Sequence, residues 1–121
     1  MRQSYEAFAR EDPAFLLALL DPAIEWMSVE DAEPRRGVEG VVESLSGWFE
    51  VWEEFHIEPE EFIDGGRHVI AVVKESGRVK GSESQVSERF FQVWTMRDDK
   101  IVAFREFKSR QEALEAAGLP T

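Results

Sequence analysis

The sequence contains no cysteine, which excludes a disulfide framework and any chemistry that needs a thiol. Basic residues are few: 14 Lys and Arg stand against 25 Asp and Glu, a formal net charge of −11. Nucleic acids and anionic membranes both attract a positive surface, so we expect neither as a partner. No apolar run has the length of a signal peptide or of a membrane span. These absences predict a cytoplasmic protein, and its 121 residues predict one domain over residues 1–121.

Histidine and glycine-rich motifs are also scarce. The two histidines, His56 and His68, lie outside any cluster with the spacing of metal ligands. The sequence shows neither a phosphate-binding glycine loop nor a nucleophile elbow. We therefore expect no metal ion and no cofactor.

The strongest pattern lies in residues 84–108, where two alternating runs flank the polar turn at residues 97–100. This pattern is typical of a long antiparallel hairpin. Side chains alternate across a strand with period two, so Phe90, Gln92 and Trp94 share one face of the first run. Phe104 and Glu106 share one face of the second run. Both faces of each run are largely apolar, which predicts that something covers each side.

Helical periodicity marks three segments, at residues 2–10, 14–20 and 38–55. Asp12 and Pro13 are a good start for the second segment, which is nearly all apolar and should be buried, with an end at residues 21–22. The acids of the longest segment share its opposite face and indicate a solvated surface. A capping box at residues 109–112 predicts a last helix that stops at Gly118.

Strand patterns fill the rest of the chain, at residues 23–29, 56–63 and 67–76 and in the main hairpin. The acidic loop 30–34 should be exposed, and residues 77–81 should form a flexible connection. The order is helix, helix, strand, long helix, four strands and a short helix. This order predicts an α+β fold in which helices pack on one face of a curved antiparallel sheet.

This order, with the residues at its joints, resembles the nuclear transport factor 2-like superfamily. Within the superfamily, the chain is most similar to the SnoaL-like polyketide cyclase and ketosteroid isomerase-like group. The resemblance rests on Tyr5, Phe8 and Asp12, on residues 19–26, on Pro34, Gly37, Gly40 and Val41, and on residues 98–107. It implies a cone-shaped, curved antiparallel or mixed sheet, wrapped around the N-terminal helices and one long helix. A short C-terminal helix should complete the fold.

The resemblance also implies a deep pocket for a small hydrophobic molecule. Its wall should carry side chains from two strand faces and from the long helix: Trp26, Ser28, Glu88, Phe90, Gln92, Trp94, Phe104, Glu106, and Trp48 or Trp52. The outer face of the main hairpin would then form a homodimer interface. That face carries Phe91, Val93, Thr95, Ala103, Arg105 and Phe107.

Glu106 is the candidate catalytic residue, because the SnoaL-like cyclases carry an acid–base aspartate at the matching position. A carboxyl group among aromatic rings loses hydration, so its pKa should rise towards neutrality. Gln92 would be the second catalytic residue, as the donor that polarises a substrate. The alternative is structural: Glu106 pairs with Arg89 or Arg35 or bonds a neighbouring strand, and Gln92 bridges two strands.

The ketosteroid isomerase pattern fits poorly. It places Ser28, Ser4 and Gln92 where those enzymes carry a general-base Asp, a Tyr and a protonated Asp. This departure argues against dienolate isomerisation and leaves cyclisation, isomerisation of another kind or hydration. The competing class is a non-catalytic binding or protein-association module whose pocket is filled by its own tryptophans. A cavity of roughly 300 Å³ or more around Glu106 would favour a ligand site.

Overall fold

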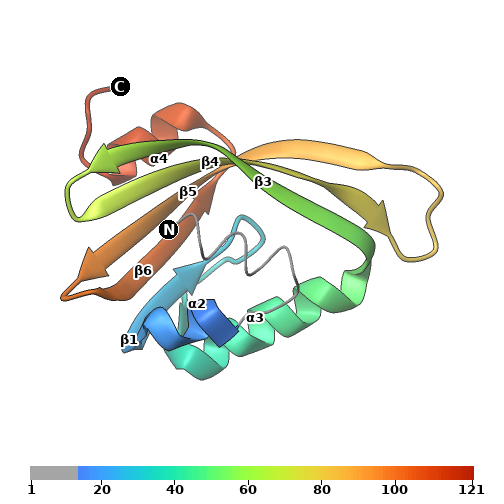
Figure 1. Ribbon diagram of the computed structural model, residues 1–121, viewed down its shortest axis with the longest axis horizontal. Coiled ribbons are helices and arrows are strands. Elements are labelled where there is room, and N and C mark those ends of the chain that lie inside the picture. The colour runs from blue at the N-terminus through green and yellow to red at the C-terminus, as the bar shows by residue number, and fades with distance from the viewer. Residues whose placement is uncertain (1–13) are drawn as a thin grey trace.

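The computed structural model describes residues 14–121, and Figure 1 shows their arrangement. The elements in chain order are α2 (Ala14–Leu19), β1 (Leu20–Met27), β2 (Arg35–Arg36), α3 (Gly37–Val51), β3 (Trp52–Gly65), β4 (His68–Val79), β5 (Val86–Arg97), β6 (Lys100–Phe107) and α4 (Arg110–Ala116). The helix predicted over residues 2–10, and the start predicted at Asp12 and Pro13, lie outside the described residues. None of the described helices is long and apolar enough to cross a membrane.

The strands form one six-stranded sheet in the order β2-β1-β6-β5-β4-β3. Neighbouring strands run antiparallel except β1 and β6, which are parallel. The sheet is therefore mixed, and the predicted α+β class is confirmed. The sheet is strongly curved, with α3 below it and α4 on the opposite side (Figure 1). The expectation that all helices share one face is thus wrong for α4.

The hydrophobic core has two parts, one on each face of the sheet. The larger part lies between α2, α3 and the sheet and includes Ile24, Trp26, Val41, Leu45, Val73, Phe90, Trp94, Ile101 and Phe104. In the smaller part, Ala113 and Ala117 pack on Phe91 and Val93. The apolar character of both faces of β5 is thereby explained within one chain, and the homodimer stays a prediction.

The last helix has the ends that the sequence predicts. Ser109 Oγ accepts a hydrogen bond from the backbone N–H of Glu112, as an N-cap side chain does. At the other end, Gly118 has a φ of 72°, and the N–H of Leu119 donates to the carbonyl of Leu114. This is the glycine-terminated C-cap, and it places Leu119 against the smaller core.

The long helix ends four residues earlier than predicted, at Val51, because residues 52–55 join β3. Trp52 pairs with Val79 and Phe55 with Gly77, so strand pairing replaces the helical repeat. Residues 77–79, expected in a flexible connection, therefore continue β4. A Cβ atom on Gly77 would lie 2.1 Å from the carbonyl oxygen of Glu54, so this close approach requires glycine.

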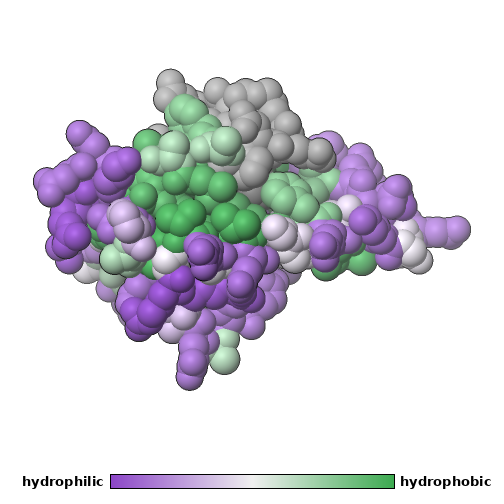
Figure 2. All heavy atoms as spheres, turned by 90° about the horizontal axis from the view of Figure 1, so that it is seen from below, coloured by the Kyte–Doolittle hydropathy of each residue, from purple (hydrophilic) through white to green (hydrophobic). Residues whose placement is uncertain are grey.

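Two smaller expectations near α2 are also wrong. Only Leu16 is buried within α2, and Phe15 is 42% exposed. Asp21 and Pro22 lie inside β1, which starts directly after the helix. Seen from the α3 side, apolar side chains gather near the middle of the molecule between hydrophilic ends (Figure 2).

Candidate functional site

A cavity of about 600 Å³ lies between α3 and the concave face of the sheet. Its lining includes every side chain predicted for the pocket wall: Trp26, Ser28, Trp48, Trp52, Glu88, Phe90, Gln92, Trp94, Phe104 and Glu106. The volume is about twice the roughly 300 Å³ set as the lower bound for a ligand site. The tryptophans therefore form walls around open space, and they do not fill it.

The aromatic wall is a packed cluster on three neighbouring positions of the sheet. Trp26 stacks on Phe104, with ring centroids 4.0 Å apart and planes 25° apart. Trp94 completes the group, at 4.6 Å from Phe104 and 5.8 Å from Trp26. The strand register explains this arrangement, because Phe104 is the direct neighbour of both tryptophans. Packing of this kind holds the rings in fixed orientations.

Glu106 lies beside this wall with a hydrogen bond to each carboxyl oxygen. Gln92 Nε2 donates to Glu106 Oε2 at 2.8 Å, and the backbone N–H of Val29 donates to Oε1 at 3.3 Å. The two arginines considered as partners lie elsewhere: Arg89 pairs with Glu60, and Arg35 pairs with Asp31. Of the structural alternatives for Glu106, the bond to a neighbouring strand is therefore the one observed.

The environment of Glu106 acts on its pKa in both directions. Burial raises the pKa, the hydrogen bonds from Gln92 and Val29 lower it, and the carboxylates of Glu30 and Asp31 raise it. The net direction is upward, as the aromatic surroundings predicted. One amide N–H of Gln92 donates to Glu106, so in this geometry Gln92 orients the carboxyl group.

Glu75 is a second buried carboxyl in the cavity, and sequence reasoning missed it. It is only 9% exposed, it lies on β4, and its Oε2 has no hydrogen-bond partner among the described residues. Burial raises the pKa of Glu75 to about 8, and repulsion from Glu106, Glu30 and Glu88 adds to this effect. The signal was the alternation Ala71, Val73, Glu75 in the sequence. The predicted pocket wall took its strand residues from residues 23–29 and from the main hairpin, and it left out the strand at residues 67–76.

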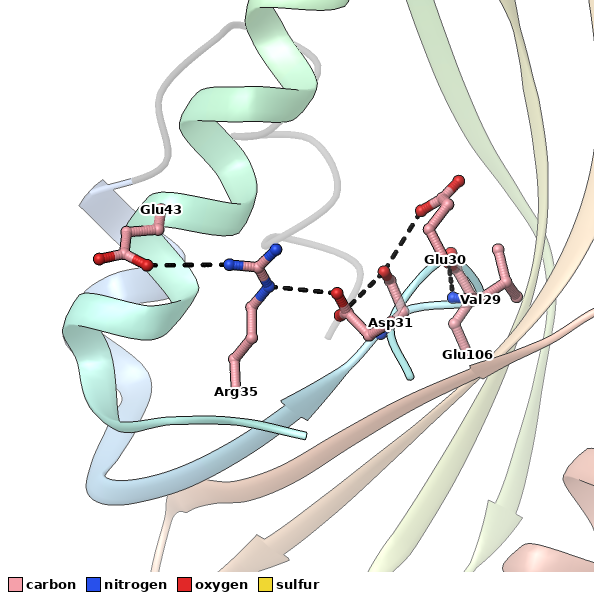
Figure 3. A network of polar contacts seen from close by, with 7 residues as sticks. Val29, Glu30, Asp31, Arg35, Glu43 and Glu106 are labelled. Carbon is pink, nitrogen blue, oxygen red and sulfur yellow. Dashed lines mark hydrogen bonds and ion pairs between the residues drawn. The ribbon is translucent and has the colours of Figure 1, made fainter. Parts of the chain in front are cut away.

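The loop after β1 lines the cavity with Ser28, Glu30 and Asp31. Figure 3 shows the polar contacts of this loop. Loop 30–34 is exposed as predicted except at Asp31, whose side chain is only 12% exposed. The Asp31 carboxylate accepts from the N–H of Ser28 at 3.0 Å and from Arg35 Nε at 3.2 Å. Ser28 Oγ also lies 3.1 Å from Asp31. These bonds hold the loop where Val29 reaches Glu106.

Arg35 extends this network to α3, because its Nη1 lies 3.8 Å from a carboxylate oxygen of Glu43. Glu43 is 75% exposed at its side chain but also borders the cavity. Glu88 is half exposed and pairs with Lys108 at 3.4 Å. No group of three or more histidines or acids within residues 14–121 is placed to hold a metal ion.

Comparisons with known proteins agree with the fold. A family model described as a SnoaL-like domain matches residues 1–104. No curated protein matches the chain significantly. Among solved structures, an NTF2-like protein from Burkholderia thailandensis is 28% identical, with a TM-score of 0.79 over 96% of this chain and 92% of its own.

Two further structures share the fold at lower identity. A proposed SnoaL-like polyketide cyclase from Jannaschia is 15% identical, with a TM-score of 0.79 over 98% of this chain and 89% of its own. TerC, co-crystallised with polyporic acid, is 22% identical, with a TM-score of 0.76 over 95% of this chain and 92% of its own. At these identities the likeness concerns the fold alone.

Proposed function

Because this chain belongs to the SnoaL-like domain family, we propose that it binds a small hydrophobic molecule in the cavity between α3 and the sheet. The observation that carries the proposal is the cavity itself, about 600 Å³ in volume and walled by Trp26, Trp94 and Phe104. Ligand sites have such volumes and largely apolar walls with a few polar groups.

We further propose acid–base catalysis without a cofactor, with Glu106 as the acid–base residue. Two fixed hydrogen bonds orient its carboxyl group, and a carboxylate has acceptor positions left after two bonds. A raised pKa makes its ionised form a stronger base towards an acidic C–H of the ligand. Glu106 would take this proton and return it at another atom, which serves a cyclisation or an isomerisation. In a hydration it would instead take a proton from the attacking water and return it to the ligand. Gln92 acts as a positioning residue.

A non-catalytic binding module is the second candidate, and one observation favours it. The bonds of Glu106 to Gln92 and Val29 join β6 to β5 and to the loop after β1, which is also what a purely structural carboxyl would do. On this view the cavity binds the same class of ligand, and Glu106 maintains its shape.

Tryptophan fluorescence tests the binding proposal. Steroids, polycyclic aromatic ketones, terpene epoxides and fatty acids form the panel, and occupancy should change the emission of Trp26 and Trp94. We expect saturable binding of one chemical class at micromolar concentration. A flat response to every class and to a hydrophobic amine, with the protein folded, would refute a hydrophobic ligand site.

The variant Glu106→Gln separates the two candidates once a ligand class is known. It retains the size of the side chain and removes the titrating group. We expect ligand binding to persist and turnover to fall by at least about a hundredfold. Unchanged turnover would show that Glu106 is not the acid–base residue. Absent turnover in the unmodified protein would favour the binding module.

A further inference from the structure

The charge of the cavity wall is unbalanced. Six of its lining residues carry a carboxyl group, namely Glu30, Asp31, Glu43, Glu75, Glu88 and Glu106, and Arg35 is the one basic residue of the described lining. Arg35 already pairs with Asp31 and Glu43. The interior of the cavity therefore holds carboxyl groups to which the described lining offers no cation.

Among these carboxyl groups, Glu75 is the buried one that has neither a cation nor a hydrogen-bond donor for its Oε2 among the described residues. It is nine-tenths buried. It lies opposite Glu88 in the β4–β5 ladder, and the charged groups that act on it are Glu106, Glu30 and Glu88, all acidic. The neighbouring Lys74 is exposed on the other face of β4 and cannot neutralise it.

Aromatic rings surround the same space. Trp26, Trp48, Trp52 and Trp94 all line the cavity, and the face of an indole ring attracts a positive charge. A buried carboxyl group and several indole rings are together the chemistry that recognises an organic ammonium ion. Neither feature would favour an anionic ligand.

We infer that the ligand of this cavity is an organic cation, an amine with a hydrophobic body whose ammonium group binds beside Glu75 among the tryptophans. This inference rests on the proposed function, and it names the ligand class of the same site. The ammonium group would donate to the open Oε2 of Glu75 and supply the positive charge that the wall lacks. The aromatic cluster would cover the hydrophobic body.

A proton should leave the protein when such a ligand binds. The raised pKa of about 8 means that Glu75 carries a proton at pH 7, and an ammonium ion beside it favours the ionised carboxylate. Because this pKa lies above 7, most Glu75 carboxyl groups carry a proton at pH 7, so binding should release up to one proton for each ligand. A neutral ligand of the same shape should release none.

The test uses three matched probes that differ in charge: naphthylethylammonium, naphthylethanol and naphthylacetate. Isothermal titration calorimetry at pH 7, in two buffers of different ionisation enthalpy, measures both the affinity and the protons released. We expect the ammonium probe to bind at least about tenfold more tightly than the alcohol. The acetate should bind most weakly.

Two variants assign the effect to one carboxyl group. Glu75→Gln should lower the affinity for the ammonium probe to that for the alcohol and abolish proton release. The matched control is Glu58→Gln, the same substitution at an exposed position of the adjacent strand β3, outside the cavity lining. The control should leave all three affinities and the proton count unchanged.

Other results would overturn the cation inference. If the alcohol binds as tightly as the ammonium probe, or the Glu75→Gln variant keeps the preference, the cation inference fails and the hydrophobic site stands. If no probe binds, both the site and the inference fail. Should the variant not fold, the proton count of the unmodified protein gives the answer, and a count near zero overturns the inference.

Discussion

The burial of Glu75 predicts how the free energy of unfolding depends on pH in the absence of any ligand. In the unfolded chain its carboxyl group loses its proton near the ordinary value of 4.5, whereas the folded protein raises this pKa to about 8. Between these values the folded state holds one more proton than the unfolded state. Glu75 therefore makes the free energy of unfolding fall as the pH rises through this interval. Below about pH 4.5 Glu75 does not lower the free energy of unfolding, and above about pH 8 the loss of free energy has reached its full size.

The cost follows from the two pKa values. The interval from 4.5 to about 8 corresponds to about 5 kcal/mol, which is an upper bound. Water entry and local relaxation around an ionised carboxylate reduce such penalties, so we expect roughly 2–5 kcal/mol at pH 9. The change Glu75→Gln removes the titrating group and keeps its size. The variant should thus gain stability over the unmodified protein as the pH rises.

Urea unfolding at pH 5, 7 and 9 measures this effect, with Glu58→Gln as the control for loss of an exposed negative charge. The difference in unfolding free energy between Glu75→Gln and the unmodified protein should grow steadily from pH 5 to pH 9. The control should show no such trend, because Glu58 is exposed. If the difference in unfolding free energy between the variant and the unmodified protein is the same at every pH, ionisation of Glu75 does not destabilise the fold. A raised pKa caused by burial is then refuted.

Two further changes test the site and the sheet. Gln92→Leu removes the hydrogen bond that lowers the pKa of Glu106, so this pKa should rise further, and the protein should lose about 1–3 kcal/mol of stability. Carbon-detected NMR titration of the Glu106 carboxyl group measures the first effect, and an unmoved titration would contradict it. Gly77→Ala should cost at least about 3 kcal/mol in urea unfolding, because its Cβ would meet the carbonyl oxygen of Glu54. The control Gly66→Ala, with open space around it, should cost only about 1–2 kcal/mol for its positive φ, and equal losses would exclude the contact as the cause.

Local rules explain how much of the site could be predicted from the sequence. Alternation along a strand is a property of the backbone, so the shared face of Phe90, Gln92 and Trp94 followed from their spacing alone. The same rule put Phe104 beside Glu106. The caps at Ser109 and Gly118 depend only on bonds within a few residues, and they were predicted to the residue.

Tertiary contacts decided the rest. The helical repeat predicted a helix through residue 55, but the pairing of Trp52 with Val79 makes residues 52–55 part of a strand. The hydrogen bond from the N–H of Val29 to Glu106 joins residues 77 positions apart in the chain, and the cover over Phe91 comes from α4. Glu75 looks like any strand acid in the sequence, and its raised pKa arises because the folded sheet brings it close to Glu106 and Glu88 and excludes water. Alternation is a short-range property that a sequence displays, whereas burial and charge proximity exist only after distant strands have met.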